Sequence, residues 1–222
     1  MKLNLKNVMA MACMSLSVMA CSDNDGGKEE TPDTKKFTDL NVSAYDQWTY
    51  VNLRTGETET HPDASEWIYT DGTTRPAQTP EEVSIDWHIA VHRYEVKTNG
   101  GSVLDTKSTD MAAFNSLPEG DYKADEVIDS EDEYKITTDM SGMMQGNVGY
   151  AKSATINRVL CGWIVKTETG SMPPYVYTPT KNVIVLKCKD GSWAKIQCTT
   201  AGNTTDGKSG YVSFNYQFYE GK

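Results

Sequence analysis

The chain has 222 residues, with 21 Lys or Arg against 31 Asp or Glu, so its formal net charge is −10. No basic run is present, and a negative charge has the wrong sign for neutralising phosphates, so the composition argues against a nucleic-acid-binding protein. Residues 37–222 are within the size of a single domain and are enough to bury a sizeable core.

Residues 1–20 have the features of an export signal. Two lysines near the start precede a short apolar stretch, well below the roughly 20 residues that a membrane-spanning helix needs. Small residues then precede Cys21, which is the pattern of a bacterial lipoprotein signal whose cysteine is lipidated. Cys13 is a competing cleavage site, but cleavage there would leave almost no apolar segment. The sequence therefore predicts a signal peptide and a lipid anchor on Cys21.

Residues 21–36 are polar and lack apolar periodicity, so we expect them to form a disordered tether. Acidic residues follow Cys21 closely, which resembles a surface-export signal of bacterial lipoproteins. We expect a protein that is anchored in the outer membrane, faces the cell exterior and is also compatible with release in soluble form. The signal holds two of the 21 basic residues and no acidic ones, so the mature chain carries a charge of −12.

Period-two alternation recurs along residues 37–222, whereas long helical patterns are missing. Residues 48–53 alternate and end at a Thr-Gly turn, and residues 65–69 predict a short strand. Residues 85–96 predict one longer strand, with Trp87, Ile89 and Val91 on the same face. One possible helix lies at residues 110–116.

The second half of the chain also has a strand pattern. Residues 157–167 alternate apolar and polar side chains and predict a strand. The apolar run 183–186, an Asp-Gly turn and residues 193–198 predict a hairpin. Residues 212–218 form the clearest pattern, with Val, Phe, Tyr and Phe on one face. The chain is therefore expected to be an all-β, sandwich-like single domain that is rich in hairpins.

The three histidines do not form a metal-binding pattern. His61 precedes a proline and is expected in a loop. His88 and His92 would share the face opposite Trp87, but at about 3.3 Å per residue they lie roughly 13 Å apart on a strand. They could not bind one ion unless the backbone folded sharply between them. We expect them to be hydrogen-bonded residues on a sheet face.

Catalytic motifs and motifs for covalent haem attachment are missing. No Gly-x-Ser-x-Gly, His-Glu-x-x-His or phosphate-loop pattern occurs, and no pair of carboxylates is singled out, so we do not expect an enzyme. No Cys-x-x-Cys occurs either, which excludes a zinc knuckle and a c-type haem. Cys161, Cys188 and Cys198 are odd in number, so at least one thiol stays unpaired, and we expect all three to be inert core residues.

The methionines are the most informative residues. Five of the ten lie after residue 20, and four of these crowd into two short loops that are rich in Gly and Pro: Met140, Met143 and Met144 in the first, and Met172 in Gly170-Ser171-Met172-Pro173-Pro174. Core methionines are usually scattered as gap-fillers. Such clustering indicates either loop packing or thioethers that serve as soft ligands for a metal or a haem iron.

Several ordered segments resemble the HmuY family, the haem-binding lipoproteins (haemophores) of Bacteroides- and Porphyromonas-like anaerobes. The run from Trp87 to Tyr94 is similar to the family strand "W-D-I-A-x-H-R-Y", although His88 stands where many members carry aspartate. The segment from Trp48 to Glu57 matches the family's opening "W-x-Y-F-x-x-x-x-G-E". Gly162-Trp163 and residues 182–185 and 194–197 follow in the family order, so the resemblance covers essentially the whole chain.

The resemblance implies an all-β fold in which a hand-like pair of loops grips haem b between two axial ligands. In the best-known member both ligands are histidines, one in a Gly-flanked turn and one just before Gly-Pro. This chain has Met143 and Met144 in the first loop and Met172 in the second, and neither loop contains a histidine. The resemblance therefore implies methionine ligation. Which of Met143 and Met144 binds stays open, and Met140 is the fallback.

The same resemblance implies the role of the protein and its partners. A haemophore takes haem from host haemoproteins or from the environment and passes it to an outer-membrane receptor, here expected to be TonB-dependent. Tyr175 and Tyr177 are candidates for lining the haem face, whereas Met111, on the possible helix, is expected in the core. The rival hypothesis is an adhesin or glycan-binding lipoprotein on a similar scaffold. A copper(I) chaperone is a third, since clustered thioethers suit that ion.

Overall fold

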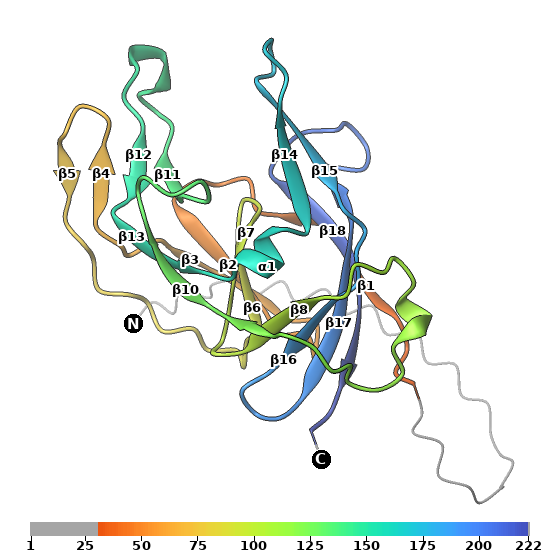
Figure 1. Ribbon diagram of the computed structural model, residues 1–222. Helices are drawn as coiled ribbons and strands as arrows, with labels where there is room; N and C mark the ends of the chain where they lie inside the picture. The colour runs from red at the N-terminus through yellow and green to blue at the C-terminus, as the bar shows by residue number, and fades with distance from the viewer. Residues whose placement is uncertain (1–30, 222) are drawn as a thin grey trace, which may run out of the picture. The chain divides into compact units, whose positions relative to one another are not determined.

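Alternating apolar side chains organise residues 31–221, the part of the chain that the computed structural model describes, into antiparallel sheets (Figure 1). The proposed signal peptide and the anchor on Cys21 lie outside these residues. Because most elements are strands joined by tight turns, the expected all-β architecture built from hairpins is confirmed. The helices of the described residues are single turns, and none has the length and apolar character of a membrane span.

The largest sheet has six strands in the order β1-β18-β17-β16-β8-β9. These are β1 (Lys35–Asn41), β18 (Tyr211–Tyr219), β17 (Trp193–Ala201), β16 (Ile184–Lys187), β8 (Ser102–Asp105) and β9 (Lys123–Ala124). The predicted hairpin is β16-β17, with Ile184 opposite Ile196, and the predicted last strand is β18. Strand β1 begins at Lys35, ahead of the domain boundary expected at Phe37.

A four-stranded sheet has the order β3-β2-β6-β7. Its strands are β2 (Gln47–Val51), β3 (Thr58–Pro62), β6 (Ile89–His92) and β7 (Glu95–Thr98). The hairpin β2-β3 confirms the turn predicted at Thr55 and Gly56 but places His61 in a strand, opposite Trp48. The loop expected at His61 is therefore wrong, because the backbone of residues 58–62 is hydrogen-bonded along β2.

Three smaller sheets complete the described residues. One has the order β11-β12-β4-β5 and the others are the pairs β10-β13 and β14-β15. Their strands are β4 (Trp67–Tyr69), β5 (Thr74–Arg75), β10 (Glu126–Asp129), β11 (Thr137–Asp139), β12 (Gly149–Ala151), β13 (Ser153–Ile156), β14 (Ile164–Glu168) and β15 (Tyr175–Pro179). The helical turns are η1 (Met111–Ala113), η2 (Met143–Gln145) and α1 (Arg158–Cys161).

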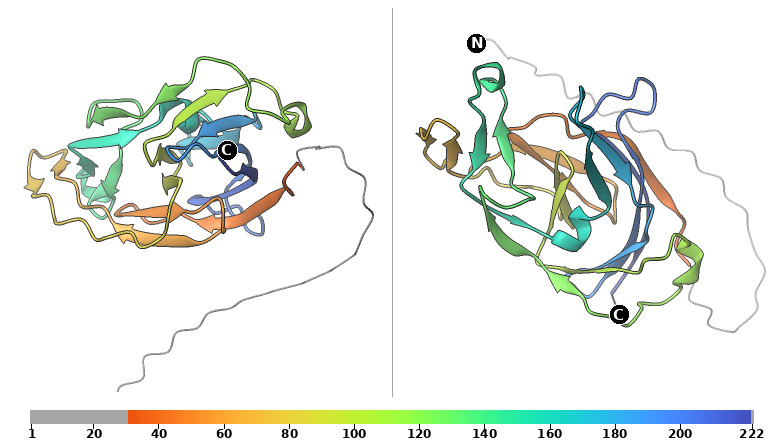
Figure 2. Two further views of the ribbon diagram at one scale, coloured as in Figure 1. Left: turned by 90° about the horizontal axis from the view of Figure 1, so that it is seen from below. Right: turned by 45° about the horizontal axis from the view of Figure 1, so that its top comes forward.

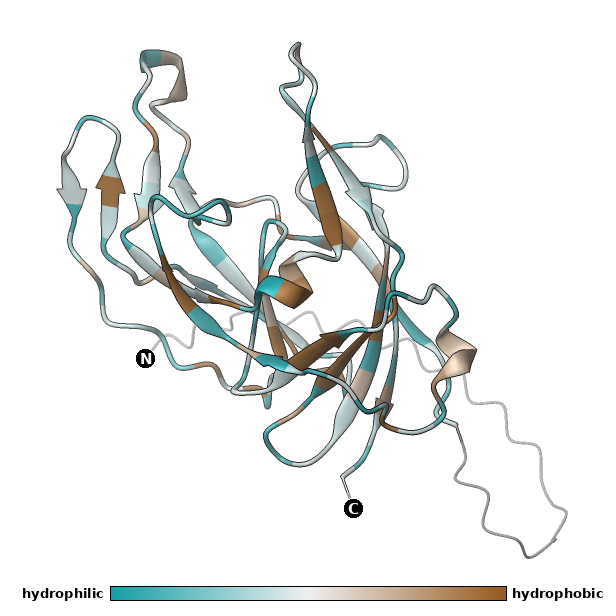
Figure 3. Ribbon diagram, viewed as in Figure 1, coloured by the Kyte–Doolittle hydropathy of each residue, from teal (hydrophilic) through white to brown (hydrophobic). Residues whose placement is uncertain are grey.

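The sheet β3-β2-β6-β7 has apolar side chains on both faces, because it lies between two hydrophobic clusters. Val51, Ile89 and Val91 pack with Ile196 and Phe214 of the six-stranded sheet in the larger cluster. Trp48 and Ala90 belong to the smaller cluster, which includes Ile128, Ala151 and Ile156 from the small sheets. The hydrophobic segments of Figure 3 are accordingly on interior elements such as β6, β8, β16 and α1.

Residues 85–96 do not form one strand, so that prediction is wrong. The chain bends at His88, runs as β6, turns at Arg93 and Tyr94, and returns as β7. Arg93 has a φ of 54°, a left-handed conformation that a continuous strand does not contain. This turn is favourable because it lets β6 bury Ile89 and Val91 in the same cluster in which β7 buries Val96.

Residues 157–167 are also not a continuous strand. Asn157 accepts a hydrogen bond from the Leu160 amide at 3.0 Å, which caps the one-turn helix α1. Strand β14 begins only at Ile164, after Trp163, whose indole donates to the Tyr94 carbonyl at 3.0 Å. The Asn157 cap favours a helical turn over the strand that the alternating pattern predicts, because the side-chain oxygen of Asn157 accepts a hydrogen bond from a helix amide that would otherwise have no partner.

The possible helix at residues 110–116 is reduced to the single 3₁₀ turn η1, with Asp110 as its cap. The turn buries no residue, and Met111 is half-buried and belongs to neither hydrophobic cluster, so the core position expected for Met111 is wrong. The buried ammonium of Lys195 donates instead to the carbonyls of Met111 and Phe114, at 2.8 and 2.7 Å. These two bonds hold the turn against the six-stranded sheet.

Candidate functional site

The first methionine loop is the tip of the hairpin β11-β12. Asp139 ends β11 and accepts hydrogen bonds from the Ser141 amide at 2.8 Å and the Tyr69 hydroxyl at 3.1 Å. A Cβ at Gly142 would lie 2.5 Å from the carbonyl oxygen of Asn147, so only glycine fits where the two sides of the loop approach. The turn η2 then carries Met143 at the tip, and Gly146 ends it with a φ of 76°.

The second methionine loop is the tip of the hairpin β14-β15. The amide of Thr169 donates to the Pro174 carbonyl at 3.0 Å and closes the loop. The Thr169 hydroxyl lies 2.6 Å from the carbonyl oxygen of Pro173, inside the loop. These contacts fix the backbone on both sides of Met172, whose side chain makes no comparable contact with the hairpin.

Three of the four loop methionines are exposed to solvent. The exposed fraction is 84% for Met144, 86% for Met172 and 50% for Met143, whereas Met140 is half-buried. Both hairpins project from the same end of the described residues (Figures 1 and 2). Thioethers as exposed as those of Met144 and Met172 contribute little to packing, so packing does not explain why methionine stands at these two positions.

A cavity of about 440 Å³ lies along one face of the second hairpin. Its wall includes Tyr94, Tyr134, Ile164, Tyr175 and Tyr177. Ligand cavities in proteins typically have volumes of roughly 300–1,000 Å³ and walls that are largely apolar or aromatic. Both tyrosines that the sequence singled out therefore line one cavity.

Strand register explains which side chains reach this cavity. Glu168 lies opposite Tyr175 and Lys166 lies opposite Tyr177, so these four residues share one face of the hairpin. The sequence analysis did not single out Ile164 and Lys166, because the alternation of the predicted strand 157–167 was started at residues that form α1. Alternation counted from Ile164 onwards would have placed both of them on the cavity face.

The groups around the cavity are arranged to stay uncharged where they are buried. Burial raises the pKa of Tyr177 to about 12, and the Tyr94 and Tyr177 rings lie 4.4 Å apart. Burial also raises the pKa of the Cys161 thiol, whose sulfur accepts from the Val96 amide at 3.2 Å. The thiolate needed for metal ligation is therefore strongly disfavoured at Cys161.

The remaining cysteines and the histidines also have structural roles. The three cysteines of the described residues are free thiols; Cys161 and Cys198 are buried as expected, but Cys188 is only half-buried. His88 accepts from the Leu53 amide at 3.1 Å, and His92 Nε2 lies 2.6 Å from the Tyr45 carbonyl. The expected hydrogen bonding is confirmed.

The two histidines do not share a face, contrary to the prediction. The His88 ring lies 4.8 Å from Phe218, which belongs to the larger hydrophobic cluster. The His92 ring lies 5.2 Å from Trp48, which belongs to the smaller one. The bend at His88 causes this difference, because it reverses the side to which that side chain points.

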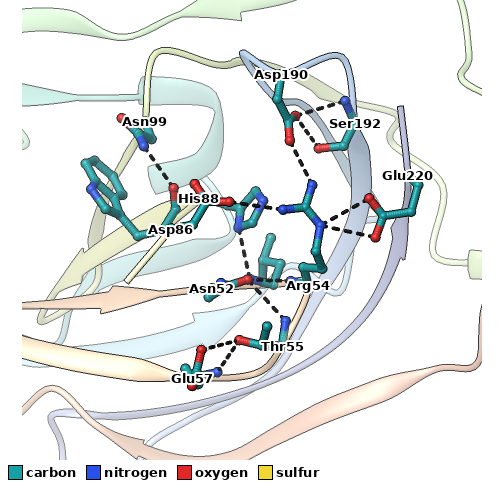
Figure 4. Close-up of polar contacts among 12 residues, drawn as sticks. Asn52, Arg54, Thr55, Glu57, Asp86, His88, Asn99, Asp190, Ser192 and Glu220 are labelled. Carbon is teal, nitrogen blue, oxygen red and sulfur yellow. Dashed lines mark hydrogen bonds and ion pairs between the residues drawn. The ribbon is translucent and has the colours of Figure 1, made fainter. Parts of the chain in front are cut away.

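A second cavity, of about 400 Å³, is lined by Asp86, His88 and Asp190 among other residues. Its carboxylates already have a cationic partner, since Arg54 pairs with Asp86, Asp190 and Glu220 at 2.8–3.1 Å (Figure 4). Within residues 31–221, no group of three or more His, Cys, Asp or Glu residues could hold a metal ion. We therefore assign this cluster a structural role, tying together the turns around it.

Comparison with known proteins identifies the relatives of the chain. The model of the HmuY protein family matches residues 44–216. A search of curated proteins finds no match. Among solved structures, the apo HmuY analogue of Tannerella forsythia is 40% identical, with a TM-score of 0.74, and the match covers 86% of this chain and 100% of that one.

Two further solved structures are similar over most of their length. Apo PinO from Porphyromonas gingivitis is 29% identical, with a TM-score of 0.74, and the match covers 86% of this chain and 100% of that one. A protein of Bacteroides vulgatus, named as HmuY-like and haem-binding, is 30% identical, with a TM-score of 0.64; the match covers 84% of this chain and 94% of that one.

Proposed function

The chain belongs to the HmuY family, and from this premise we propose that it binds haem b as cargo, with two methionine thioethers as axial ligands of the iron. Met172 supplies one thioether and Met143 or Met144 supplies the other. The observation that carries this proposal is the exposure of these side chains on two hairpin tips at the same end of the molecule. One of the hairpins is also a wall of the tyrosine-lined cavity.

Thioether ligation would determine which oxidation state of the iron is preferred. A neutral, soft sulfur ligand favours ferrous over ferric iron relative to imidazole and raises the reduction potential. A thioether also has no proton to lose near neutral pH. Haem binding should therefore be tighter under reducing conditions and should depend little on pH through the ligands themselves.

We also propose that the protein works at the cell surface. Lipidated Cys21 anchors it in the outer membrane, the residues between Cys21 and β1 act as the tether, and the domain that begins with β1 at Lys35 carries the haem. In this role the protein is not an enzyme: it takes haem from host haemoproteins or the environment and delivers it to a TonB-dependent outer-membrane receptor. The HmuY-like relatives, one of them named as haem-binding, support this assignment.

The first prediction concerns Met172. Haem added to the purified protein under dithionite is expected to give a sharp low-spin ferrous spectrum, weaker under air. Met172→Ala should abolish that spectrum and weaken binding by more than tenfold, because even outer-shell partners of metal ligands are worth roughly 10–100-fold. The side chain is 86% exposed, so its removal should leave folding intact.

Further variants complete this experiment. Met143→Ala and Met144→Ala separate the two candidates of the first loop, since only one of them should lose the spectrum. Met111→Ala is the matched control, because Met111 lies in η1, outside both loops. If the haem spectrum is not changed by the protein in either redox state, the proposal is refuted. If the protein binds copper(I) in preference to haem, a copper chaperone becomes the better hypothesis.

A further inference from the structure

Among residues 31–221, Lys166 is the only positively charged residue that lines the tyrosine-lined cavity. It projects from the cavity face of β14, opposite Tyr177, and its Nζ lies 4.0 Å from the centre of the Tyr175 ring. Within residues 31–221, no carboxylate oxygen lies within 4.0 Å of this ammonium, the limit for an ion pair, although three carboxylates line the same cavity. The charge of Lys166 is therefore available to a ligand.

The three carboxylates are Glu95, Glu133 and Glu168, and they make the rest of the wall repulsive to an anion. Glu133 lies 3.5 Å from Arg158, and Glu95 lies 3.8 Å from the buried His92 ring, whereas Glu168 ends β14. An anionic group that enters the cavity is thus attracted by Lys166 and repelled by the three carboxylates. Such an arrangement orients a ligand as well as attracting it.

We infer that Lys166 is a specificity-determining residue that pairs with a propionate carboxylate of the haem and sets the orientation of the porphyrin. This inference rests on the proposed haem binding. Haem carries two propionates on one edge and only methyl and vinyl groups on the opposite edge. The propionate edge would then lie at Lys166, beside the Tyr175 ring, and the apolar edge would point away from this ammonium.

The charge of the whole protein makes a local cation necessary. The mature chain carries −12, so its long-range field repels a ligand that brings two carboxylates. At an ionic strength of about 0.15 M this field is screened beyond roughly 8 Å, whereas Lys166 and a propionate attract each other at contact distance, and salt weakens this attraction as well because Lys166 is exposed. Added salt should therefore relieve the general repulsion and weaken the specific pair.

The test compares two ligands and two variants of the full chain. The ligands are haem and its dimethyl ester, which has the same ring and iron but no carboxylates. The variants are Lys166→Gln and the control Lys189→Gln, which removes the same charge from an exposed residue of the second cavity. Ferrous binding of each ligand is measured by absorbance titration in low and high salt.

Lys166→Gln is expected to weaken haem binding roughly two- to fivefold at low salt, the range for an exposed ion pair, and to leave the ester unaffected. Lys189→Gln should change neither ligand. Equal effects of Lys166→Gln on haem and ester, or no effect on haem, would overturn the inference while the proposed function stands. If the unmodified protein binds neither ligand, the proposed function fails and the inference fails with it.

Discussion

Buried polar side chains in this protein have specific partners, and Asp63 illustrates how they orient its hairpins. Its carboxylate accepts from the indoles of Trp48 and Trp67 at 2.8 and 2.9 Å. Burial alone would raise the pKa of Asp63, but hydrogen bonds from Ser65 and the two indoles lower it below its usual value. The ionised carboxylate thus joins β2 to β4, which pairs with the methionine-bearing hairpin through β12.

The pH dependence of stability should depend in part on His61. Its ring nitrogens lie 2.9 Å from Glu81 and 2.6 Å from Glu59. The hydrogen bond to Glu81 has the largest effect on the pKa of His61, and together the two carboxylates raise this pKa above 6.5, although burial lowers it. A raised pKa stabilises the fold fully below pH 6.5, and this contribution disappears as the pH rises through the folded value. The pKa of Glu59 is about 2, so Glu59 stays ionised throughout.

The expected outcome is that His61→Gln lowers the free energy of unfolding more at pH 6 than at pH 9. Denaturant unfolding at the two pH values measures the difference. Thr58→Ala, at an exposed position of the same strand, is the control and should show no such pH dependence. A His61→Gln effect that is equal at both pH values would contradict the assignment.

Among the elements, the one-turn helix α1 depends on a single residue. Asn157 is fully buried, caps the Leu160 amide, and donates from its side-chain nitrogen to the Lys123 carbonyl and the Asp125 carboxylate, both at 3.0 Å. These bonds position the start of β14, and hence the cavity face of that hairpin.

Asn157→Ala is expected to lower the free energy of unfolding by about 3 kcal/mol. Loss of the cap contributes about 1 kcal/mol, and the buried groups left without partners contribute roughly 1–3 kcal/mol. Urea unfolding measures the change. Asn115→Ala, at an exposed position without a side-chain hydrogen bond, should change stability by less than about 0.5 kcal/mol. A small effect at Asn157 would mean that α1 does not depend on its cap.

Hairpins and turns were the elements that the sequence predicted best. Strands β16, β17 and β18 follow from runs of apolar residues and an Asp-Gly turn, because alternation and turn chemistry are local properties. The strands predicted at 85–96 and 157–167 failed where a turn or a cap interrupts an alternating pattern. In both segments the interruption satisfies long-range packing that no local pattern records.

At the largest scale, the proposed attachment to the membrane through Cys21 should be separable from the fold of residues 31–221. Cys21→Ala should move the protein from the membrane fraction to the soluble fraction, because the lipid would be lost while haem binding is unchanged. Cell fractionation and a haem titration of the soluble protein measure the two properties. Cys13→Ala is the matched control and should remain in the membrane fraction; loss of anchoring in this control instead would reassign the lipidated residue.

The all-β class, the resemblance to the HmuY family and the gathering of the methionines in two loops were all predictable from the sequence, because periodicity, turn residues and motif order are local properties of the chain. The packing of the sheets was needed to show that both loops are hairpin tips at one end and that Tyr94, Tyr134, Lys166 and Tyr177 share a cavity. Tyr94 and Tyr177 are far apart in sequence, and their 4.4 Å contact depends on the turn after β6, the cap at Asn157 and the pairing of β14 with β15. Such a contact follows from how sheets pack, which local patterns do not encode.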